Sequence, residues 1–282
     1  MDYKELVKDE WLFIRRNKEK IVNYATVMYK QKNDNDDKGY VKSALDYKKL
    51  EYICQEFEKE RKVSYNLTKV ADRVLKGDCS MKEKLHSGEI YYPSDDSIME
   101  EQFKCLEKLY DFNATRPSEM EKRNVLLKEM FSDIGEECYI EPPFHANWGG
   151  KHCHFGRNVY ANFGLTCVDD THIYVGDYTM FGPNVVLATA GHPICPELRQ
   201  KNYQYNMPIH IGKNCWLGAG VIVLPGVTIG DNVVIGAGSV VTKDIPSGVV
   251  AVGNPCKVLR EVGEHDYEFY YKDRKIPEDM KI

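Results

Sequence analysis

The sequence predicts a mainly β protein, in which a parallel β-helix is preceded by α-helical segments. Two observations lead to this fold class. Glycine is distributed unevenly, because residues 1–148 hold four glycines and residues 149–282 hold the other 17. From Phe155 onward, aliphatic or aromatic residues also recur with a period of six. Since a single fold does not distribute glycine in this way, we place the main architectural boundary near Trp148.

The composition is that of an ordinary soluble globular protein. The 282 residues are 43% hydrophobic and 29% charged, with a net charge of −5, and this length allows roughly one or two domains. The acidic balance argues against a nucleic-acid binder held by bulk positive charge. The N-terminus carries charges where a secretion signal has an apolar run, and the uncharged stretch 214–230 is broken by Gly and Pro. We therefore expect a cytoplasmic protein with no membrane partner.

Residues 1–80 are predicted to form a helical N-terminal extension. Apolar residues such as Val7, Trp11 and Ile14 recur at helical spacing, with charged residues between them. The segment carries 18 basic and 15 acidic side chains, which describes a solvated surface and not a basic patch for DNA. Its role stays open between contacts with a partner or another subunit and an appendage that packs on its own chain.

Residues 81–148 are predicted to be a helical segment that leads into the repeat. Ser118 and Glu121 have the spacing of a capping box, in which each side chain bonds the backbone N–H at the other position. We therefore expect a helix that is capped at Ser118, with Leu127 and Phe131 on its apolar face.

Residues 149–260 carry the six-residue repeat. Its starting positions keep one unbroken register in the last part of this region: Ile211, Leu217, Val223, Ile229, Ile235 and Val241. An α-helix turns by about 600° over six residues and would scatter these side chains around its circumference. Short strands joined by tight turns instead bury one apolar residue per face, and stacked coils share a continuous core. Glycine suits the corners, where a positive φ or close stacking of coils is required.

The repeat is interrupted once, by a loop of residues 188–210. The loop begins with Ala188-Thr189-Ala190-Gly191-His192-Pro193 and continues as a polar and aromatic run. A corner of such a coil is easily extended outward, and functional residues often lie on such insertions. Residues 261–282 are predicted to be a C-terminal tail.

Several segments resemble the galactoside and maltose O-acetyltransferases, which are hexapeptide-repeat acetyltransferases. They include Val168-Asp169-Asp170, Pro183-Asn184-Val185, Gly191-His192-Pro193, Pro225 to Asn232 and Val241 to Pro246. The similarity extends from near Met81 to about Arg260 and leaves residues 1–80 without a counterpart. It implies a left-handed parallel β-helix, homotrimers with active sites in clefts between neighbouring coils, and an acyltransferase that moves an acetyl group from acetyl-CoA to a sugar hydroxyl without a metal.

The resemblance implies that His192 is the catalytic residue. A sugar hydroxyl is too weak an acid to attack a thioester unaided, and a neutral imidazole can take its proton as the attack proceeds. An imidazole pKa of about 6.5 lies close to working pH, and general base catalysis is typically worth about 10²–10⁴-fold. A lone histidine on a loop is more often structural, but the Gly-His-Pro context at the interruption of the repeat favours catalysis.

The resemblance also implies residues that hold the acceptor sugar. Asn162 and Asp170 match acceptor-binding positions, and Asp95 matches one through a short segment. Without the family, a turn-capping role for Asp170 is about as plausible. Trp148 stands where the family carries a small polar or acidic residue. Its indole is predicted to stack on a sugar ring, which would change the identity of the acceptor.

Eight residues match coenzyme-binding positions of the family. Small residues let the pantetheine arm lie against the coil, three cations suit the phosphates of coenzyme A, and an aromatic residue stands beside the cleft. The eight residues are Gly182, Trp216, Ala219, Ala237, Thr242, Lys243, Lys257 and Arg260.

Two other functions are compatible with a β-helix. A metal-dependent hydratase needs three histidines that meet across a subunit interface, and the candidates His152, His154 and His172 do not match that pattern in their local sequence. A non-catalytic scaffold would use residues 1–80 as a docking module and would bind no coenzyme. The nine cysteines include no C-x-x-C pair, so we expect reduced thiols and no zinc site.

Overall fold

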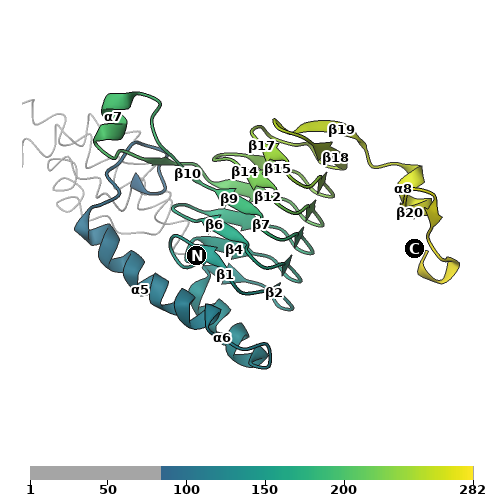
Figure 1. The fold of residues 1–282 in the computed structure, drawn as a ribbon, viewed down its shortest axis with the longest axis horizontal. Helices are drawn as coiled ribbons and strands as arrows, with labels where there is room; N and C mark the ends of the chain where they lie inside the picture. The colour runs from purple at the N-terminus through teal and green to yellow at the C-terminus, as the bar shows by residue number, and fades with distance from the viewer. Residues whose placement is uncertain (1–83, 282) are drawn as a thin grey trace, which may run out of the picture. The chain divides into compact units, whose positions relative to one another are not determined.

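The computed structural model describes residues 84–281, which belong to one structural unit, Met81–Ile282. The predicted N-terminal extension of residues 1–80 lies outside the described residues. Two helices come first and are followed by a β-helix, whose coils stack along one axis, and by a short C-terminal segment (Figure 1). None of the helices in residues 84–281 combines the length and the apolar character that a membrane span requires.

Three sheets form the walls of the β-helix, and each coil contributes one short strand to each sheet in turn. The first sheet contains β1 (Asp133–Ile134), β4 (Cys153–Phe155), β7 (Ile173–Val175), β12 (Ile209–Ile211) and β15 (Thr228–Ile229). The second contains β2 (Tyr139–Ile140), β5 (Tyr160–Ala161), β8 (Met180–Phe181), β13 (Trp216–Leu217), β16 (Val234–Ile235), β18 (Val249–Val252) and the antiparallel β19 (Lys257–Glu261). The third contains β3 (His145–Ala146), β6 (Thr166–Val168), β9 (Val186–Ala188), β14 (Ile222–Val223) and β17 (Val240–Val241).

Two of the corners between these sheets carry the predicted site residues. We call the column of corners that follows the strands of the second sheet the second–third edge. The column that follows the strands of the third sheet is the third–first edge. The third sheet lies between these two edges, so residues on one edge are separated from residues on the other by a whole strand of the coil.

The core of the β-helix confirms the six-residue period. The six starting positions are at most 4% exposed: Ile211, Leu217, Val223, Ile229, Ile235 and Val241. Leu217 pairs with Phe181 in the coil before it and with Ile235 in the coil after it, so like positions lie next to each other. Burial of one such side chain contributes roughly 1.5–3 kcal/mol. The predicted fold class, a parallel β-helix of hexapeptide repeats preceded by helices, is confirmed.

Close stacking of coils explains glycine at the second–third edge. A Cβ added at Gly182 would lie 2.7 Å from the backbone nitrogen of Ala219, and one added at Gly218 would lie 2.7 Å from that of Ala237. Neither glycine has a positive φ. Because a Cβ atom does not approach a neighbouring backbone this closely, only glycine fits where one coil passes beneath the next.

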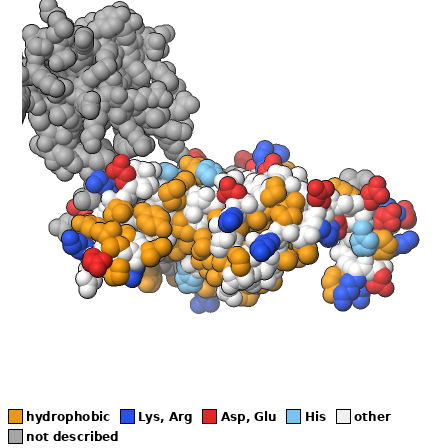
Figure 2. All heavy atoms as spheres, turned by 90° about the horizontal axis from the view of Figure 1, so that it is seen from above, with side chains coloured by type: hydrophobic (Ala, Val, Ile, Leu, Met, Phe, Trp, Pro, Cys, Tyr) orange, Lys and Arg blue, Asp and Glu red, His pale blue; other side chains and the backbone are white. Residues whose placement is uncertain are grey.

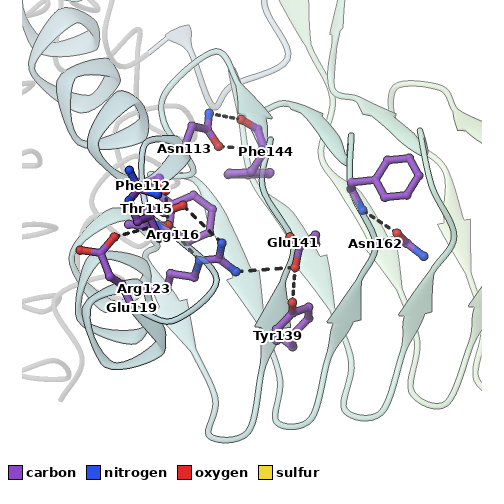
Figure 3. A network of polar contacts seen from close by, with 11 residues as sticks. Phe112, Asn113, Thr115, Arg116, Glu119, Arg123, Tyr139, Glu141, Phe144 and Asn162 are labelled. Carbon is purple, nitrogen blue, oxygen red and sulfur yellow. Dashed lines mark hydrogen bonds and ion pairs between the residues drawn. The ribbon is translucent and has the colours of Figure 1, made fainter.

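The helices α5 (Asp96–Asn113) and α6 (Met120–Met130) lie against the first coils (Figure 1). Arg123 of α6 is buried, donates from Nε to Oγ1 of Thr115 at 2.9 Å, and places Nη1 3.6 Å from Oε2 of Glu141 (Figure 3). The side-chain amide of Asn113 bonds both the N–H and the C=O of Phe144 at 2.8 Å. These contacts fix the helices to the corner between β2 and β3.

The predicted capping box at Ser118 is wrong. Helix α6 begins at Met120, and the residue before it is Glu119, which makes no side-chain cap. The carboxylate of Glu119 instead accepts the N–H of Arg116 at 2.7 Å. The acidic side chain therefore closes the turn before the helix.

The interruption of the repeat leaves the third–first edge between β9 and β12. It carries β10 (Ala190–Gly191), helix α7 (Pro196–Gln200) and β11 (Tyr205–Asn206), and β10 pairs with β11 in antiparallel fashion. After β19, the chain continues beyond the last coil (Figure 1). This tail contains α8 (Glu264–Glu268), β20 (Phe269–Tyr271), β21 (Arg274–Lys275) and the 3₁₀ turn η1 (Glu278–Met280).

Candidate active site

His192 lies on the loop directly after β10, at the third–first edge. Its side chain is exposed, and its Nδ1 lies 2.8 Å from the carbonyl oxygen of Tyr203. Because a carbonyl oxygen only accepts, this bond places the hydrogen on Nδ1 and the lone pair on Nε2. An imidazole held in this tautomer can take a proton at Nε2, as a general base must.

The neck of the loop holds the backbone before His192 close to the coil. Ala190 pairs with Asn206, and Gly191 pairs with Tyr205. A Cβ at Gly191 would lie 2.7 Å from the ring of Tyr205, so this ring packs directly against the glycine backbone. Gly191 is therefore required for a close approach of the aromatic ring.

Asp170 lies at the same edge, on the corner after β6. It is 6% exposed, and its Oδ2 accepts a hydrogen bond from Nδ2 of Asn147 at 2.8 Å. Burial raises the pKa of Asp170, and the bond from Asn147 opposes this rise. Asn147 is exposed and follows β3, the strand that pairs with β6. Asn147 is not among the residues predicted from the sequence, and the repeat register would not have identified it, because it places Asn147 level with Val168.

Trp148 is not exposed at the site, contrary to the prediction. Its side chain is 1% exposed and packs in a cluster with Leu85, Tyr91 and Ile98. The indole therefore belongs to the core beneath the corner and offers no surface on which a sugar ring could stack. The exposed side chain of this corner is that of the preceding residue, Asn147.

Buried polar groups hold this corner from behind. Asp169 is fully buried and accepts the N–H of Trp148 at 2.7 Å and the N–H of Gly150 at 3.0 Å. Burial raises the pKa of Asp169 to about 7. The carbonyl oxygen of Asp169 lies 2.6 Å from Nδ1 of His152, and burial holds the pKa of His152 well below its usual value.

The other two predicted acceptor residues lie on other elements of the chain. Asp95 stands at the start of α5, where its carbonyl accepts the N–H of Ile98 at 2.9 Å. Asn162 follows β5 at the second–third edge, and its Oδ1 accepts the N–H of Phe163 at 2.8 Å (Figure 3). Within one chain, Asn162 is therefore on a different edge from His192.

A column of small residues continues along the second–third edge. Ala219 and Ala237 are exposed at equivalent corners of neighbouring coils, and Gly182 occupies the corner before them. Trp216 is 54% exposed on β13 beside this column, level with Met180 of β8. The structure thus brings together four of the residues predicted to bind the coenzyme.

The predicted polar and cationic coenzyme ligands lie on the last coils. Thr242 and Lys243 are exposed at the third–first edge after β17, and Lys257 and Arg260 are exposed on β19. Arg260 is already engaged, because Nη1 bonds Oδ2 of Asp266 at 2.6 Å and Nη2 bonds Oδ1 at 2.7 Å. The guanidinium lowers the pKa of Asp266 to about 2. A phosphate that binds Arg260 must share or displace this carboxylate.

The histidines of the hydratase alternative lie on and beside the first sheet. Nε2 of His154 lies 2.9 Å from Nδ1 of His172, and His152 is bonded to the backbone. Within residues 84–281, no group of three or more His, Cys, Asp or Glu side chains is arranged to hold a metal ion. The seven cysteines of this range are free thiols.

Comparison with known proteins identifies the family. Residues 84–135 match a family model described as the maltose acetyltransferase hexapeptide capping motif, and residues 208–243 match one described as bacterial transferase hexapeptide (six repeats). The galactoside O-acetyltransferase of Lactococcus lactis is 54% identical over 200 residues, which cover 71% of this chain and 97% of that protein. The galactoside O-acetyltransferase of Escherichia coli is 47% identical over 196 residues, which cover 70% and 96%. The chain belongs to the galactoside O-acetyltransferase family.

Solved structures of relatives agree. A galactoside acetyltransferase in complex with coenzyme A matches with a TM-score of 0.69 and 46% identity, over 71% of this chain and 100% of that chain. A hexapeptide-repeat acetyltransferase from Vibrio cholerae complexed with acetyl coenzyme A matches with a TM-score of 0.61 and 29% identity, over 66% of this chain and 100% of that chain. As a member of the galactoside O-acetyltransferase family, the chain is an acyltransferase, and the predicted enzyme class is confirmed.

Residues 1–55 match a third family model, described as Toxin ToxN, type III toxin-antitoxin system. This segment lies outside the described residues. The match covers less than a fifth of the 282 residues and does not show that the chain belongs to a second family.

Proposed function

We propose that this chain transfers an acetyl group from acetyl-CoA to a hydroxyl of a sugar or related small acceptor, with His192 as the general base. The observation that carries the proposal is the 2.8 Å contact between Nδ1 of His192 and the carbonyl oxygen of Tyr203, which leaves Nε2 to take a proton. The names of the relatives support the class of acceptor, and the coenzyme A in a related structure supports the donor.

In the proposed reaction, the acceptor hydroxyl attacks the carbonyl carbon of the thioester. As the new O–C bond forms, Nε2 of His192 takes the hydroxyl proton, and the ring becomes an imidazolium. The tetrahedral intermediate then breaks its C–S bond, and the imidazolium gives the proton to the departing sulfur. The products are an acetyl ester and the free thiol of coenzyme A, and His192 is neutral again.

We propose that Asp170 and Asn147 orient the acceptor beside His192, because all three lie at the third–first edge. A carboxylate oxygen and an amide, already bonded to each other at 2.8 Å, suit hydrogen bonds to neighbouring sugar hydroxyls. Asp95 and Asn162 remain proposed acceptor contacts on the basis of the family resemblance. Trp148 is not retained, because it is buried.

On the donor side, we propose that the column of small residues forms the path of the pantetheine arm. Ala219 and Ala237 are exposed and present only a methyl group, so an extended chain can lie against the coil. The set proposed to contact the coenzyme is Gly182, Trp216, Ala219, Ala237, Thr242, Lys243, Lys257 and Arg260. Glycine at position 182 is required by the stacking of coils whether or not a coenzyme binds.

We also propose a cytoplasmic homotrimer in which a neighbouring subunit completes each site. His192 and Asn162 lie on opposite edges of the third sheet, and a second copy could bring these two edges together. Met180 and Trp216 on the second sheet are 46% and 54% exposed, as expected for side chains that another copy covers. Figure 2 shows hydrophobic side chains gathered between charged ones on one face of the described unit. Sedimentation tests this assembly, because one chain has a mass of 32.5 kDa.

We also keep the division of the chain into segments that the sequence predicts, except for the start of the β-helix. Residues 1–80 are an extension of unknown role, residues 81–132 lead into the β-helix, and residues 261–282 are the tail. The predicted extent of the β-helix, residues 149–260, begins one coil too late, because β1, β2 and β3 already form the first coil.

The reaction is tested by thiol release from acetyl-CoA, read with a thiol reagent across mono- and disaccharides, amino sugars and L-serine. We expect acceptor-dependent release that falls by about 10²–10⁴-fold in His192→Ala, because the variant removes the base. Acetyl-CoA binding and the melting temperature should stay unchanged, since the side chain is exposed.

The matched control is His210→Ala. His210 is also exposed, but its ring stacks on Tyr174 at 4.7 Å on the first sheet, away from the loop of His192. Wild-type turnover in His192→Ala would contradict the role of the base. Absence of both thiol release and acetyl-CoA binding in the wild-type protein would favour the scaffold alternative.

A further inference from the structure

We propose that Tyr91 is a positioning residue for His192, which it holds through a buried hydrogen-bond network with Gln204 and Asn206. This inference rests on the proposed function of His192 as the general base. Tyr91 and Asn206 are each 1% exposed, and Gln204 is 8% exposed, so the network is closed to water. It joins the segment before α5 to the loop that carries His192.

One peptide group connects Tyr91 to the catalytic ring. The N–H of Gln204 donates to the carbonyl oxygen of Tyr91 at 3.0 Å, and the N–H of Tyr91 donates to the carbonyl oxygen of Gln204 at 2.9 Å. The carbonyl of Tyr203 belongs to the same planar peptide group as the N–H of Gln204. This carbonyl accepts from Nδ1 of His192. Because the N–H and the C=O point in opposite directions within this plane, the bond from the N–H to Tyr91 orients the carbonyl that accepts from His192.

The phenol oxygen of Tyr91 fixes the same pairing through side chains. It lies 2.7 Å from Nε2 of Gln204 and 2.9 Å from Nδ2 of Asn206, and both amides donate to it. Nε2 of Gln204 also donates to Oδ1 of Asn206 at 3.0 Å. Both N–H groups of the Gln204 amide are therefore used. Loss of the phenol oxygen would leave one buried N–H of Gln204 without a partner, so the network resists local opening of the loop.

The network also reaches the acceptor side of the site. Nδ2 of Asn206 lies 3.0 Å from the carbonyl oxygen of Leu85 and 3.3 Å from that of Asp170. The side chain of Asp170 is the one bonded to Asn147. Tyr91 thus stands at the junction of the segments that carry the base and the acceptor carboxylate.

The variant Tyr91→Phe removes the hydroxyl and keeps the ring that packs with Trp148. We expect kcat to fall on the order of tenfold, because the imidazole is less often in the productive orientation. The KM for acetyl-CoA should change by less than about twofold, because the proposed donor residues lie on other elements. Tyr139→Phe is the matched control, since it also loses a bonded phenol, here to Glu141 on the second sheet (Figure 3), and should keep wild-type kcat.

Dependence on His192 is tested in a His192→Ala background, with imidazole added as an untethered base. In this background Tyr91→Phe should have no further effect, because no ring remains on the loop to be positioned. An equal loss of turnover in both backgrounds would overturn the proposal, and so would wild-type kcat in the single variant. A merely structural role predicts a lower melting temperature with unchanged kcat.

Hydrogen exchange read by mass spectrometry separates this inference from the proposed function, because it needs no turnover. In Tyr91→Phe, amides of residues 190–206 should exchange faster than in the wild-type protein, and those of residues 214–241 should not change. If the wild-type protein acetylates no acceptor, the proposed function fails, while faster exchange in residues 190–206 still supports Tyr91 as the anchor of the loop. Unchanged exchange in residues 190–206 overturns the inference whatever the activity.

Discussion

The two edges of the third sheet border the same strands but are built differently. At the third–first edge, the buried side chains of Asp170 and Asn206 take part in hydrogen bonds between segments that are distant in the sequence. At the second–third edge, small residues such as Ala219 contribute almost no side chain. The coils there are joined by backbone bonds, such as the one from the N–H of Gly182 to the carbonyl of Leu217 at 2.8 Å.

This difference suits two tasks: the third–first edge orients the base and the acceptor, and the second–third edge leaves room for the coenzyme. A base and a carboxylate act only within a narrow range of geometry, so the edge that carries His192 needs specific, bonded side chains. An extended coenzyme arm needs a smooth path, so the opposite edge needs the absence of large side chains. Substitutions of His192 or Asp170 at the third–first edge should therefore lower kcat, and substitutions in the column of small residues at the second–third edge should raise the KM for acetyl-CoA.

After His192→Ala, the largest effect is expected from a large side chain at the second–third edge. Ala237→Leu adds three carbon atoms at an exposed corner and should block the proposed path of the pantetheine arm. We expect the KM for acetyl-CoA to rise by at least about tenfold, which corresponds to about 1.4 kcal/mol, with an unchanged melting temperature. Steady-state kinetics and thermal melting give both quantities.

The control for this variant is Ala114→Leu, another exposed alanine, at the end of α5. It adds the same atoms far from the second–third edge and should leave the KM for acetyl-CoA unchanged. If Ala237→Leu instead lowers kcat at an unchanged KM, the column of small residues is not the path of the coenzyme. The proposed difference in function between the two edges would then be wrong.

The second–third edge is also the part of the molecule that the sequence predicts best. Each hexapeptide makes the same local contacts as its neighbours, so burial at Leu217 or Val223 follows from the period alone. The need for glycine at Gly182 likewise follows from the stacking of one coil on the next. His192 is predicted from the family resemblance, supported by its place where that regular pattern is interrupted, and its role stays a prediction.

The structure of the third–first edge could not be predicted in the same way, because its side-chain contacts are not periodic. Tyr91 bonds Gln204 and Asn206 across 113 and 115 residues, and no repeat relates these positions. Trp148 and Asn147 are neighbours in the sequence, yet one is buried and the other exposed. The local sequence does not tell which of two adjacent corner residues turns inward, since the cluster that buries Trp148 comes from the segment before α5 and from the start of α5.

A smaller effect, on how the free energy of unfolding depends on pH, should arise at the third–first edge. His152 is buried, and its pKa in the folded chain is held well below the usual value by that burial. Below about pH 6.5 the unfolded chain binds this proton and the folded chain does not, so this residue costs stability as the pH falls, with a slope that approaches about 1.4 kcal/mol per pH unit. His152→Gln should therefore gain stability relative to the wild-type protein between pH 7 and 5, measured by denaturant unfolding.

The comparison with the wild-type protein is needed because neighbouring groups titrate as well. Burial raises the pKa of Asp169 to about 7, so Asp169 adds stability as the pH falls from 7 towards 4, the opposite sense from His152. Burial lowers the pKa of His86 to about 4, and its ring lies 4.7 Å from that of His152. The parts of these contributions that His152→Gln leaves unchanged cancel in the difference between variant and wild type. A difference that does not vary with pH would show that His152 is not the buried neutral group described here.

The smallest effect is expected where the donor side meets the C-terminal tail. Asp266→Asn removes the charge that engages Arg260 and keeps an oxygen for the N–H of Gly263, which Asp266 accepts at 2.9 Å. If Arg260 binds a phosphate of the coenzyme, its release should lower the KM for acetyl-CoA by only about two- to fivefold, because an exposed, solvent-screened ion pair is weak. Glu278→Gln, which loses only the exposed pair with Lys281, is the control.

Acetyl-dephospho-CoA, which lacks the 3′-phosphate, shows whether Arg260 binds that phosphate. A higher KM in Asp266→Asn would instead mean that the pair with Asp266 holds Arg260 in place for the coenzyme, and the tail would then be part of the donor site.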